Sequence, residues 1–251
     1  MRRLIRNLDK LFFKGKSEPI LRATQISKFI LQVAGRSRHQ SSIFSQSAKP
    51  DLLTSLLEKH GSDKSSSKES GVHSYARFYS LLLGISRESI GTVFECGIGT
   101  TNLTLPSNMG RTGSPGASLR AWRDYFPNAQ IYGADIDREV LFEEERISTF
   151  YVDQLSESAI TQMWSQIPNL NFDLIIDDGL HTFEAGVTFY ENSIAKLKDS
   201  GVYVIEDVTP RNLVKFAEYF KDTKNFVDYV SLKSLKVGLR PDNNLVIIRK
   251  S

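Results

Sequence analysis

Short apolar runs alternate with longer amphipathic stretches along the chain, beginning near residue 50. The short runs are rich in β-branched and aromatic residues, as buried strands are, whereas the longer stretches space their apolar residues as helices do. Seven strands are predicted, at Thr92–Cys96, Gln130–Asp135, Ile147–Val152, Phe172–Asp177, Val202–Glu206, Phe226–Ser231 and Leu245–Arg249. Six helices are predicted, at Asp51–Lys59, Tyr75–Leu83, Ala117–Tyr125, Ser156–Gln166, Phe183–Lys198 and Arg211–Phe220. This alternation predicts an α/β fold, with a mostly parallel sheet and helices on both faces.

The connection between the last two predicted strands differs from the others. Residues 232–244 contain a glycine and a proline and show no strong helical pattern. A parallel connection needs a long crossover, usually a helix, whereas antiparallel strands do not. We therefore expect these two strands to form an antiparallel pair at the edge of the sheet.

The first 49 residues have a different character. The opening MRRLIRNLDKLFFKGK places Leu4, Leu8 and Leu11 on one helical face and basic residues largely on the other, which predicts a basic amphipathic helix. Such a helix packs on the domain or on a second subunit, binds an anionic membrane surface, or serves as an organelle transit peptide. Residues 36–50 are polar and rich in Ser and Gln, which indicates a linker or mobile loop. The predicted division of the chain is thus a basic helical extension with a linker at 1–49 and a main domain at 50–251.

Charge and composition narrow the class of protein. The net charge is +3, but residues 1–49 carry a balance of +9 and the rest carries −6, so the main domain lacks the basic surface of a nucleic-acid-binding protein. One cysteine, Cys96, excludes an internal disulfide and a cysteine-based zinc cluster. No apolar run is long enough to span a bilayer and no secretory signal opens the chain, so we expect a cytoplasmic protein, with peripheral contact at the inner membrane face as the alternative.

Polar residues follow the predicted strands at the edge where ligands bind in open α/β sheets. The first strand leads into a turn whose glycines let the backbone approach a ligand closely. The acid after the second strand suits both hydroxyls of a ribose, and the pair after the third suits the edge of an adenine. The candidate cofactor-binding residues at these three ends are Glu95, Gly97, Gly99, Asp135, Asp153 and Gln154.

The spacing of these residues argues against a dinucleotide. The dinucleotide fingerprint needs a third glycine, where this chain has Asn102, and an acid about 20 residues further on. Asp135 lies 36 residues after Gly99, and no phosphate-binding G-x-x-x-x-G-K-[ST] motif is present. S-adenosylmethionine, a nucleoside without phosphates, therefore fits better.

Several segments together resemble one family. VFECGIGTTN, PGASLRAWRDYFPNAQIYGADID, RISTFYVDQ, FDLIIDDGLH and GVYVIEDV, after HGSDKSSSKESGVHSYARFY, resemble the class I S-adenosylmethionine-dependent methyltransferases. Within these, they are similar to the metal-dependent sugar O-methyltransferases of the macrocin and mycinamicin type and to cephalosporin hydroxylase-like proteins. The resemblance covers roughly residues 52 to 250.

This resemblance implies a Rossmann-like seven-stranded sheet and assigns tasks to several residues. Glu95, Gly97 and Gly99 would surround the methionine part of the cofactor, with Asp135 at the ribose and Asp153 and Gln154 at the adenine. The segment with Asp63 and Lys64 would close over the cofactor or substrate. Further candidates for cofactor binding are Ser118, Asp177, His73 and Tyr75. The chain departs from the plain fold by inserting LTLPSNMGRTGSP after the glycine turn, either as a lid over the cofactor or as a surface loop.

Two further strand ends carry adjacent acids. The fourth predicted strand ends in Asp177 and Asp178, and the fifth in Glu206 and Asp207. Four converging carboxylates are costly unless a cation balances them, and oxygen ligands favour Mg²⁺, Mn²⁺ or Ca²⁺. The resemblance implies the same divalent site. The predicted metal ligands are Asp178, Glu206 and Asp207, with Asp177 as the replacement for Asp178.

The predicted reaction is transfer of a methyl group to a hydroxyl of a sugar or a glycosylated metabolite. Asp178 would help to hold the metal that orients the acceptor, and His181 would take its proton as general base. His181 is equally suited to be a metal ligand, a partner of one, or a residue that starts the next helix. A catechol-like or amine acceptor, or a non-catalytic protein with this fold, is the alternative. We expect a homo-oligomer that binds a small-molecule or glycan acceptor.

Overall fold

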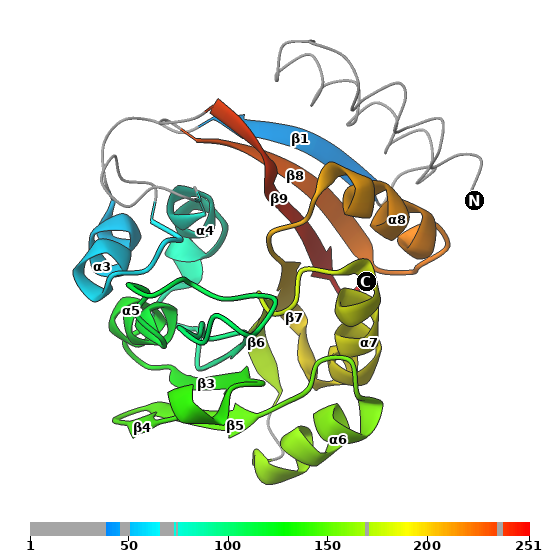
Figure 1. Ribbon diagram of the computed structural model, residues 1–251. Helices are drawn as coiled ribbons and strands as arrows, with labels where there is room; N and C mark the ends of the chain where they lie inside the picture. The colour runs from blue at the N-terminus through cyan, green and yellow to red at the C-terminus, as the bar shows by residue number, and fades with distance from the viewer. Residues whose placement is uncertain (1–38, 46–50, 66–72, 74, 169–170, 235–237) are drawn as a thin grey trace.

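The computed structural model describes residues 39–45, 51–65, 73, 75–168, 171–234 and 238–251. Within these residues a nine-stranded mixed sheet forms the centre of the protein (Figure 1), in the order β1-β8-β9-β7-β6-β2-β3-β5-β4. The strands are β1 (His39–Ser45), β2 (Thr92–Cys96), β3 (Gln130–Asp135), β4 (Glu143–Glu144), β5 (Ile147–Tyr151), β6 (Phe172–Asp177), β7 (Leu197–Ile205), β8 (Phe226–Ser234) and β9 (Gly238–Arg249).

The strand directions confirm the predicted fold class. β2, β3, β5, β6 and β7 pair in parallel with one another, and β9 runs antiparallel to both β7 and β8. All seven predicted strands are present, but the prediction of seven was too low because β1 and β4 also join the sheet. β4 has only two residues, paired antiparallel with β5, and is too short to leave a sequence pattern.

Six α-helices of the described chain cover the sheet. They are α3 (Leu52–His60), α4 (Ala76–Leu83), α5 (Ala117–Tyr125), α6 (Glu157–Gln166), α7 (Phe183–Ser193) and α8 (Pro210–Phe220), with 3₁₀ turns η1 (Gly84–Ser86), η2 (Arg138–Val140) and η3 (Ile194–Lys196). A side-chain oxygen caps four of the helices by accepting a hydrogen bond from the amide three residues further on. The caps are Asp51, Ser156, Thr182 and Thr209.

One predicted helix was too long. The apolar pattern predicted a helix from Phe183 to Lys198, but α7 ends at Ser193 and β7 already begins at Leu197. The 3₁₀ turn η3 connects the two. Its apolar residues continue a helical spacing although the α-helix has already ended. Periodicity alone could not separate these three elements.

Alternate residues of the central strands face two separate cores. Phe94 and Ile175 belong to a core with side chains of α6, α7 and α8, whereas Val93, Leu174 and Ile176 belong to a core with side chains of α3, α4 and α5. Both cores consist of fully buried residues, which explains why these strands read as nearly continuous apolar runs. The sheet is thus sandwiched between two layers of helices, as Figure 1 shows.

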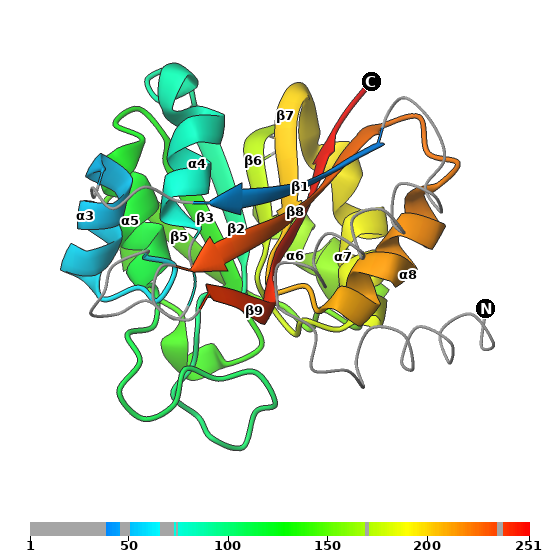
Figure 2. The ribbon, with the colours of Figure 1, turned by 90° about the horizontal axis from the view of Figure 1, so that it is seen from above.

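The edge of the sheet differs from expectation. Residues 39–45, predicted to belong to a polar linker, form β1, which pairs in parallel with β8 from His39 opposite Val227 to Ser45 opposite Lys233. Figure 2 shows β1 alongside β8. The predicted antiparallel pair of β8 and β9 is confirmed, but it does not lie at the edge because β1 covers β8. The polar composition of the segment hid this strand, because strands pair through their backbone groups.

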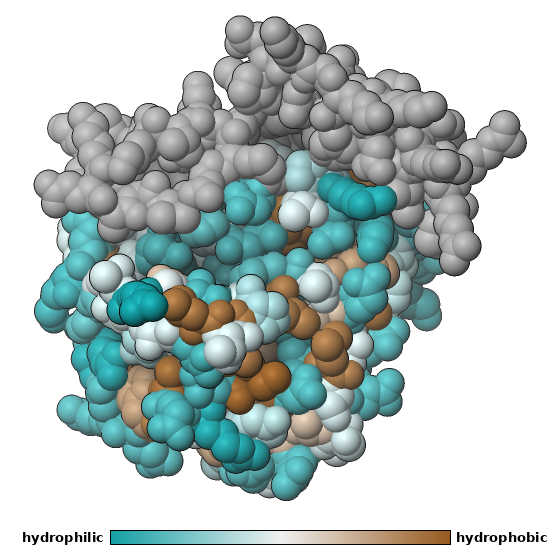
Figure 3. Space-filling view, in the orientation of Figure 1, coloured by the Kyte–Doolittle hydropathy of each residue, from teal (hydrophilic) through white to brown (hydrophobic). Residues whose placement is uncertain are grey.

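Three observations concern the surface and the ends of the chain. None of the described helices is both long and apolar enough to cross a bilayer. The basic helix predicted at the start lies outside the described residues, and the domain boundary near Pro50 stays a prediction. The face of the molecule in Figure 3 is mostly hydrophilic, with small groups of hydrophobic residues near its middle.

Candidate active site

Three neighbouring strands bring their terminal acids together. In the sheet, Cys96 of β2 lies opposite Asp177 of β6, which lies opposite Ile205 of β7. The pairing continues past the strands, since the amide of Asp178 donates to the carbonyl of Cys96 at 2.8 Å and that of Glu206 donates to the carbonyl of Asp177 at 2.9 Å. The predicted convergence of acids at one rim of the sheet is therefore present in the structure.

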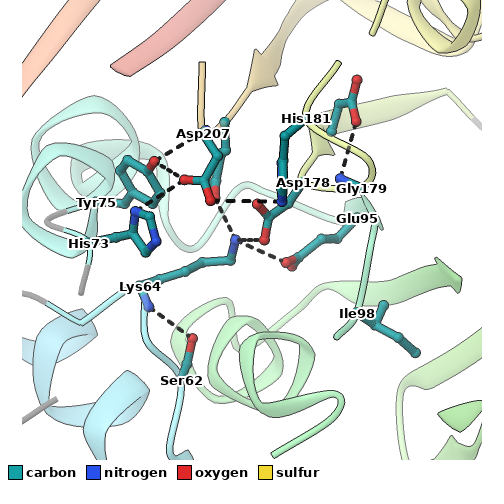
Figure 4. A network of polar contacts seen from close by, with 12 residues as sticks. Ser62, Lys64, His73, Tyr75, Glu95, Ile98, Asp178, Gly179, His181 and Asp207 are labelled. Carbon is teal, nitrogen blue, oxygen red and sulfur yellow. Dashed lines mark hydrogen bonds and ion pairs between the residues drawn. The ribbon is translucent and has the colours of Figure 1, made fainter. Parts of the chain in front are cut away.

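The ammonium of Lys64 lies within this group of acids (Figure 4). Its Nζ is 2.5 Å from Oδ2 of Asp178, 2.5 Å from Oε2 of Glu206 and 3.3 Å from Oε1 of Glu95. Burial alone would lower the pKa of Lys64, but the three carboxylates raise it well above its ordinary value. We name Lys64, Glu95, Asp178 and Glu206 the lysine cluster. The positive charge that balances its acids belongs to Lys64, which lies almost thirty positions before the first predicted strand.

Two aromatic side chains complete the lysine cluster. The hydroxyl of Tyr79 donates to Oε1 of Glu206 at 2.5 Å, and Nε1 of Trp122 donates to Oε2 of Glu95 at 2.6 Å. Glu95 and Glu206 are almost fully buried. Burial raises the pKa of Glu206 to about 7, against the opposing charge of Lys64. Both oxygens of Glu206 thus have partners from the protein itself.

A second group of polar residues lies beside the lysine cluster. Asp178, His181 and Asp207 each place one potential metal-binding atom within 4.8 Å of those of the other two residues. We name these residues the aspartate–histidine group. The hydroxyl of Tyr75 donates to Oδ1 of Asp207, and Nδ1 of His73 lies 3.1 Å from the same oxygen without hydrogen-bond geometry. The predicted candidates His73 and Tyr75 therefore meet at Asp207, where their rings also stack.

The backbone conformation sets the direction of two of these side chains. His181 and Asp207 have φ values of 58° and 52°, in the left-handed region that residues with a Cβ rarely adopt. Strained backbone of this kind concentrates at functional sites. At Asp207 the left-handed turn separates two adjacent acids. Glu206 contacts Lys64 in the lysine cluster, whereas Asp207 points toward His73 and His181 (Figure 4).

His181 connects the glycine-turn loop with the acids. Its Nε2 lies 3.1 Å from Oγ of Ser107, in the inserted segment, and 3.8 Å from Oδ2 of Asp207. Burial lowers the pKa of His181, against the raising effect of Asp207. The ring is therefore neutral at neutral pH, which is the form that accepts a proton or binds a metal.

The glycine turn lies directly against the acids. Gly97 and Gly99 both have φ of 85°, and a Cβ on Gly97 would lie 2.1 Å from the carbonyl oxygen of Asp178. A Cβ on Gly99 would lie 2.2 Å from the sulfur of Met109, in the inserted segment. Both glycines are needed for their backbone conformation and for close approach. The turn predicted to bind the methionine part of a cofactor thus adjoins the aspartate–histidine group.

The other predicted cofactor residues make internal contacts. Asp135 accepts hydrogen bonds from the amides of Ile98 and Asp137, both at 2.9 Å, and burial raises its pKa. Asp153 accepts from the amide of Leu155 at 3.0 Å. Ser118 is buried in the first turn of α5. Asp135 and Asp153 do lie at strand ends, as predicted, and the half-exposed Ile136 and Leu155 lie close to them along the chain.

Gln154 and Asp177 form a pair of their own. The amide nitrogen of Gln154 donates to Oδ1 of Asp177 at 2.5 Å, and its oxygen accepts from the amide of Leu180 at 2.8 Å. Burial raises the pKa of Asp177 to about 6. Because Asp177 turns toward Gln154, it does not join Asp178 in either group. Of the two adjacent aspartates, Asp178 is the one that faces His181 and Lys64.

Sequence reasoning missed part of this site. By sequence, Lys64 is only a member of a resembling segment, and no part in the site is predicted for Tyr79 or Trp122. A signal did exist for the tyrosines, since Tyr75 and Tyr79 are four residues apart and face the same side of a helical turn. Their hydroxyls reach the adjacent acids Asp207 and Glu206.

The donor set of the aspartate–histidine group fits a divalent cation. It supplies two carboxylates and one imidazole from two neighbouring strand ends. The structure places Glu206, the third predicted ligand, with Lys64 and Tyr79 instead. The buried Nδ1 of His181 has no hydrogen-bond partner among the described residues.

Comparisons with known proteins agree with this arrangement. No family model matches the chain. It is 31% identical over 188 residues to 8-demethyl-8-alpha-L-rhamnosyl tetracenomycin-C 2'-O-methyltransferase of Streptomyces olivaceus, covering 74% of this chain and 45% of that protein. It is 37% identical over 93 residues to demethylmacrocin O-methyltransferase of Streptomyces fradiae, covering 37% of this chain and 23% of that protein. The chain spans less than half the length of these two relatives.

Solved structures identify the fold. MycE methyltransferase from the mycinamycin biosynthetic pathway, in complex with Mg, SAH and mycinamycin VI, superposes with a TM-score of 0.58 at 24% identity, covering 82% of this chain and 56% of that one. The fold is that of a class I methyltransferase. The methyltransferase fold and the sugar O-methyltransferase relatives together confirm the resemblance that the motifs indicated.

Proposed function

We propose that this chain carries the catalytic domain of an S-adenosylmethionine-dependent O-methyltransferase that acts on a hydroxyl of a sugar or a glycosylated metabolite. The observation that carries the proposal is the aspartate–histidine group beside the glycine turn of a methyltransferase fold. One relative named above acts on a rhamnosyl compound by its name, which supports a glycosylated small molecule as acceptor.

We further propose that Asp178 and Asp207 hold a divalent cation, Mg²⁺ first, with His181 and Glu206 nearby. A bound cation of this kind lowers the pKa of an acceptor hydroxyl and orients it. Tyr75 fixes the carboxylate of Asp207 by hydrogen bonding to one of its oxygens. Because its ring is neutral, His181 can take the hydroxyl proton as the oxygen attacks the methyl group.

The cofactor would lie along the strand ends. The glycine turn at Gly97 and Gly99 would adjoin its methionine part, and Asp135, Asp153 and Gln154 would lie at the positions expected for ribose and adenine. The half-exposed Ile136 and Leu155 offer apolar surface for the adenine faces. Self-association of the chain and contact of residues 1–49 with a membrane surface remain predictions.

The decisive experiment combines cofactor binding with a metal-dependent turnover assay. We expect S-adenosylhomocysteine to bind in calorimetry, and methyl transfer to rhamnosylated acceptors to require Mg²⁺. Asp207→Asn should reduce kcat/KM by about 100-fold or more, since metal ligands supply several kcal/mol to such reactions, and should leave cofactor affinity unchanged. Asp199→Asn is the matched control, because Asp199 is fully exposed and lies near the start of β7, the strand whose other end leads to Asp207. Full turnover in excess chelator would contradict the proposed metal.

A second variant separates two tasks of His181. If His181 is the proton acceptor, His181→Asn lowers kcat while the affinity for Mn²⁺ stays within about twofold. If His181 is a ligand, Mn²⁺ affinity falls by about 10- to 100-fold. The proposed role as base predicts the first result. It also predicts that the variant loses the fall in kcat that protonation of His181 causes in the wild type as the pH is lowered.

A further inference from the structure

The position of Lys64 overlaps with the metal site predicted from the sequence. Its ammonium is 2.5 Å from Asp178 and 2.5 Å from Glu206, and these are two of the three acids predicted to hold a divalent cation. The third, Asp207, lies outside the lysine cluster and is held by Tyr75. One positive group of this chain thus contacts two of the three acids that the sequence predicts as metal ligands, and one of these, Asp178, also belongs to the aspartate–histidine group.

The lysine cluster is largely buried, so the positive charge of Lys64 is needed to stabilise its acids. Lys64 is 3% exposed, Glu206 1% and Glu95 0%. The side chain of Asp178 is 21% exposed. Three carboxylates that lie together, two of them fully buried, repel one another unless a cation lies between them. The hydroxyl of Tyr79 and the indole of Trp122 neutralise none of this charge, so Lys64 supplies the positive charge that keeps the acids assembled.

We propose that Lys64, which contacts both Asp178 and Glu206, is a built-in counter-ion that competes with the divalent cation for Asp178. The proposal rests on the function proposed above, since it concerns the same acids. Before metal binding, the ammonium holds both carboxylates in place. When the metal binds, the ammonium gives up its contact with Asp178 and moves away on its flexible four-carbon stem.

Elementary electrostatics gives the direction of the effect. An ammonium and a divalent cation that share a carboxylate lie a few ångströms apart and repel each other strongly at the effective dielectric of a protein. Replacing Lys64 by a neutral side chain removes this repulsion and leaves the acids without a counter-ion. The same change should therefore tighten metal binding and destabilise the metal-free protein.

The test measures Mn²⁺ affinity by electron paramagnetic resonance on the full chain, without acceptor or turnover. We expect Lys64→Met to lower the Kd for Mn²⁺ at least about tenfold, and Lys64→Arg, which keeps the charge, to leave it near the wild-type value. Lys198→Met is the matched control. It removes a lysine that contacts both oxygens of Asp173 at 2.8 Å, outside the lysine cluster and beside the start of β2, and it should not change the Kd.

Each outcome is decisive. Equal or weaker Mn²⁺ binding by Lys64→Met would overturn the competition between lysine and metal, while leaving the metal site itself intact. If neither protein binds Mn²⁺, the metal site of the proposed function fails and this inference fails with it. Should Lys64→Met not fold, the wild type still answers the question through the ¹⁵N spectrum of its lysine ammonium groups. The Lys64 signal is the slowly exchanging one that is absent from the spectrum of Lys64→Arg. It must shift when the wild type is saturated with Mg²⁺, and an unchanged signal contradicts the proposal.

Discussion

Adjacent residues take separate tasks at this rim of the sheet. Glu206 enters the dry lysine cluster, whereas Asp207, with its left-handed backbone, faces the two histidines. Asp177 pairs with Gln154, whereas Asp178 lies between Lys64 and His181. The sequence predicts that four acids meet here, but the direction of each depends on backbone torsions and on partners far away along the chain.

The close approach of the glycine turn to Asp178 leads to a prediction. Gly97→Ala places a methyl group 2.1 Å from the carbonyl oxygen of Asp178, in addition to the cost of a left-handed backbone. We expect the free energy of unfolding, measured with urea, to fall by about 3 kcal/mol. Gly110→Ala is the control, because Gly110 has φ of 70° and open space around its Cα. Its cost should be only about 1 kcal/mol, and equal losses at the two positions would contradict the close contact.

The central strands connect the site to the opposite end of the sheet. While their carboxyl ends carry the acids, Asp173 near the start of β6 accepts hydrogen bonds from the amides of Gly91 and Thr92, at 2.8 and 3.0 Å, and from Lys198 at 2.8 Å. One carboxylate thereby ties the start of β2 to β6 and β7. This contact helps to set the register that brings Glu95, Asp178 and Glu206 together at the other end.

Asp173 should give the stability of the protein a defined pH dependence. Burial alone would raise its pKa, but the hydrogen bonds from Lys198 and the two amides lower it below 3.8. A lowered pKa stabilises the fold above pH 3.8, and this contribution is lost as the pH falls through the folded-state value. Asp173→Asn should therefore cost about 1 kcal/mol at pH 7, after allowance for solvent screening, and the difference should vanish in strong acid. Urea unfolding at several pH values checks this, with Asp199→Asn expected to change little.

At the scale of the whole molecule, the sheet extends beyond the strands that form the site. β8 and β9 continue it past β7, and β1 covers β8 at the edge. An uncovered edge strand is a template for pairing with another chain. The segment expected to be a linker therefore covers β8 and becomes the edge strand of the described sheet. The boundary between extension and domain stays a prediction.

Two truncations test the contribution of β1. A chain that starts at His39 keeps all seven pairs between β1 and β8, whereas one that starts at residue 46 loses them. The second chain should unfold at a Tm lower by about 5 °C or more, since 1 kcal/mol corresponds to about 2–4 °C in a domain of this size. It should also scatter more light on heating, because β8 is then exposed. Identical melting curves and scattering would show that β1 adds no stability.

The sequence by itself determined the strands of the central sheet, most helix boundaries and the strand ends at which the chemistry lies. These features follow from local periodicity, from caps such as Thr182 and Thr209, and from the rule that parallel strands end at one edge. Only the tertiary structure decided that Lys64 enters the group of acids, that Tyr75 and Tyr79 bind Asp207 and Glu206, and that β1 pairs with β8. Those contacts join residues distant along the chain, so no local pattern specifies them. They depend on the packing of the whole fold.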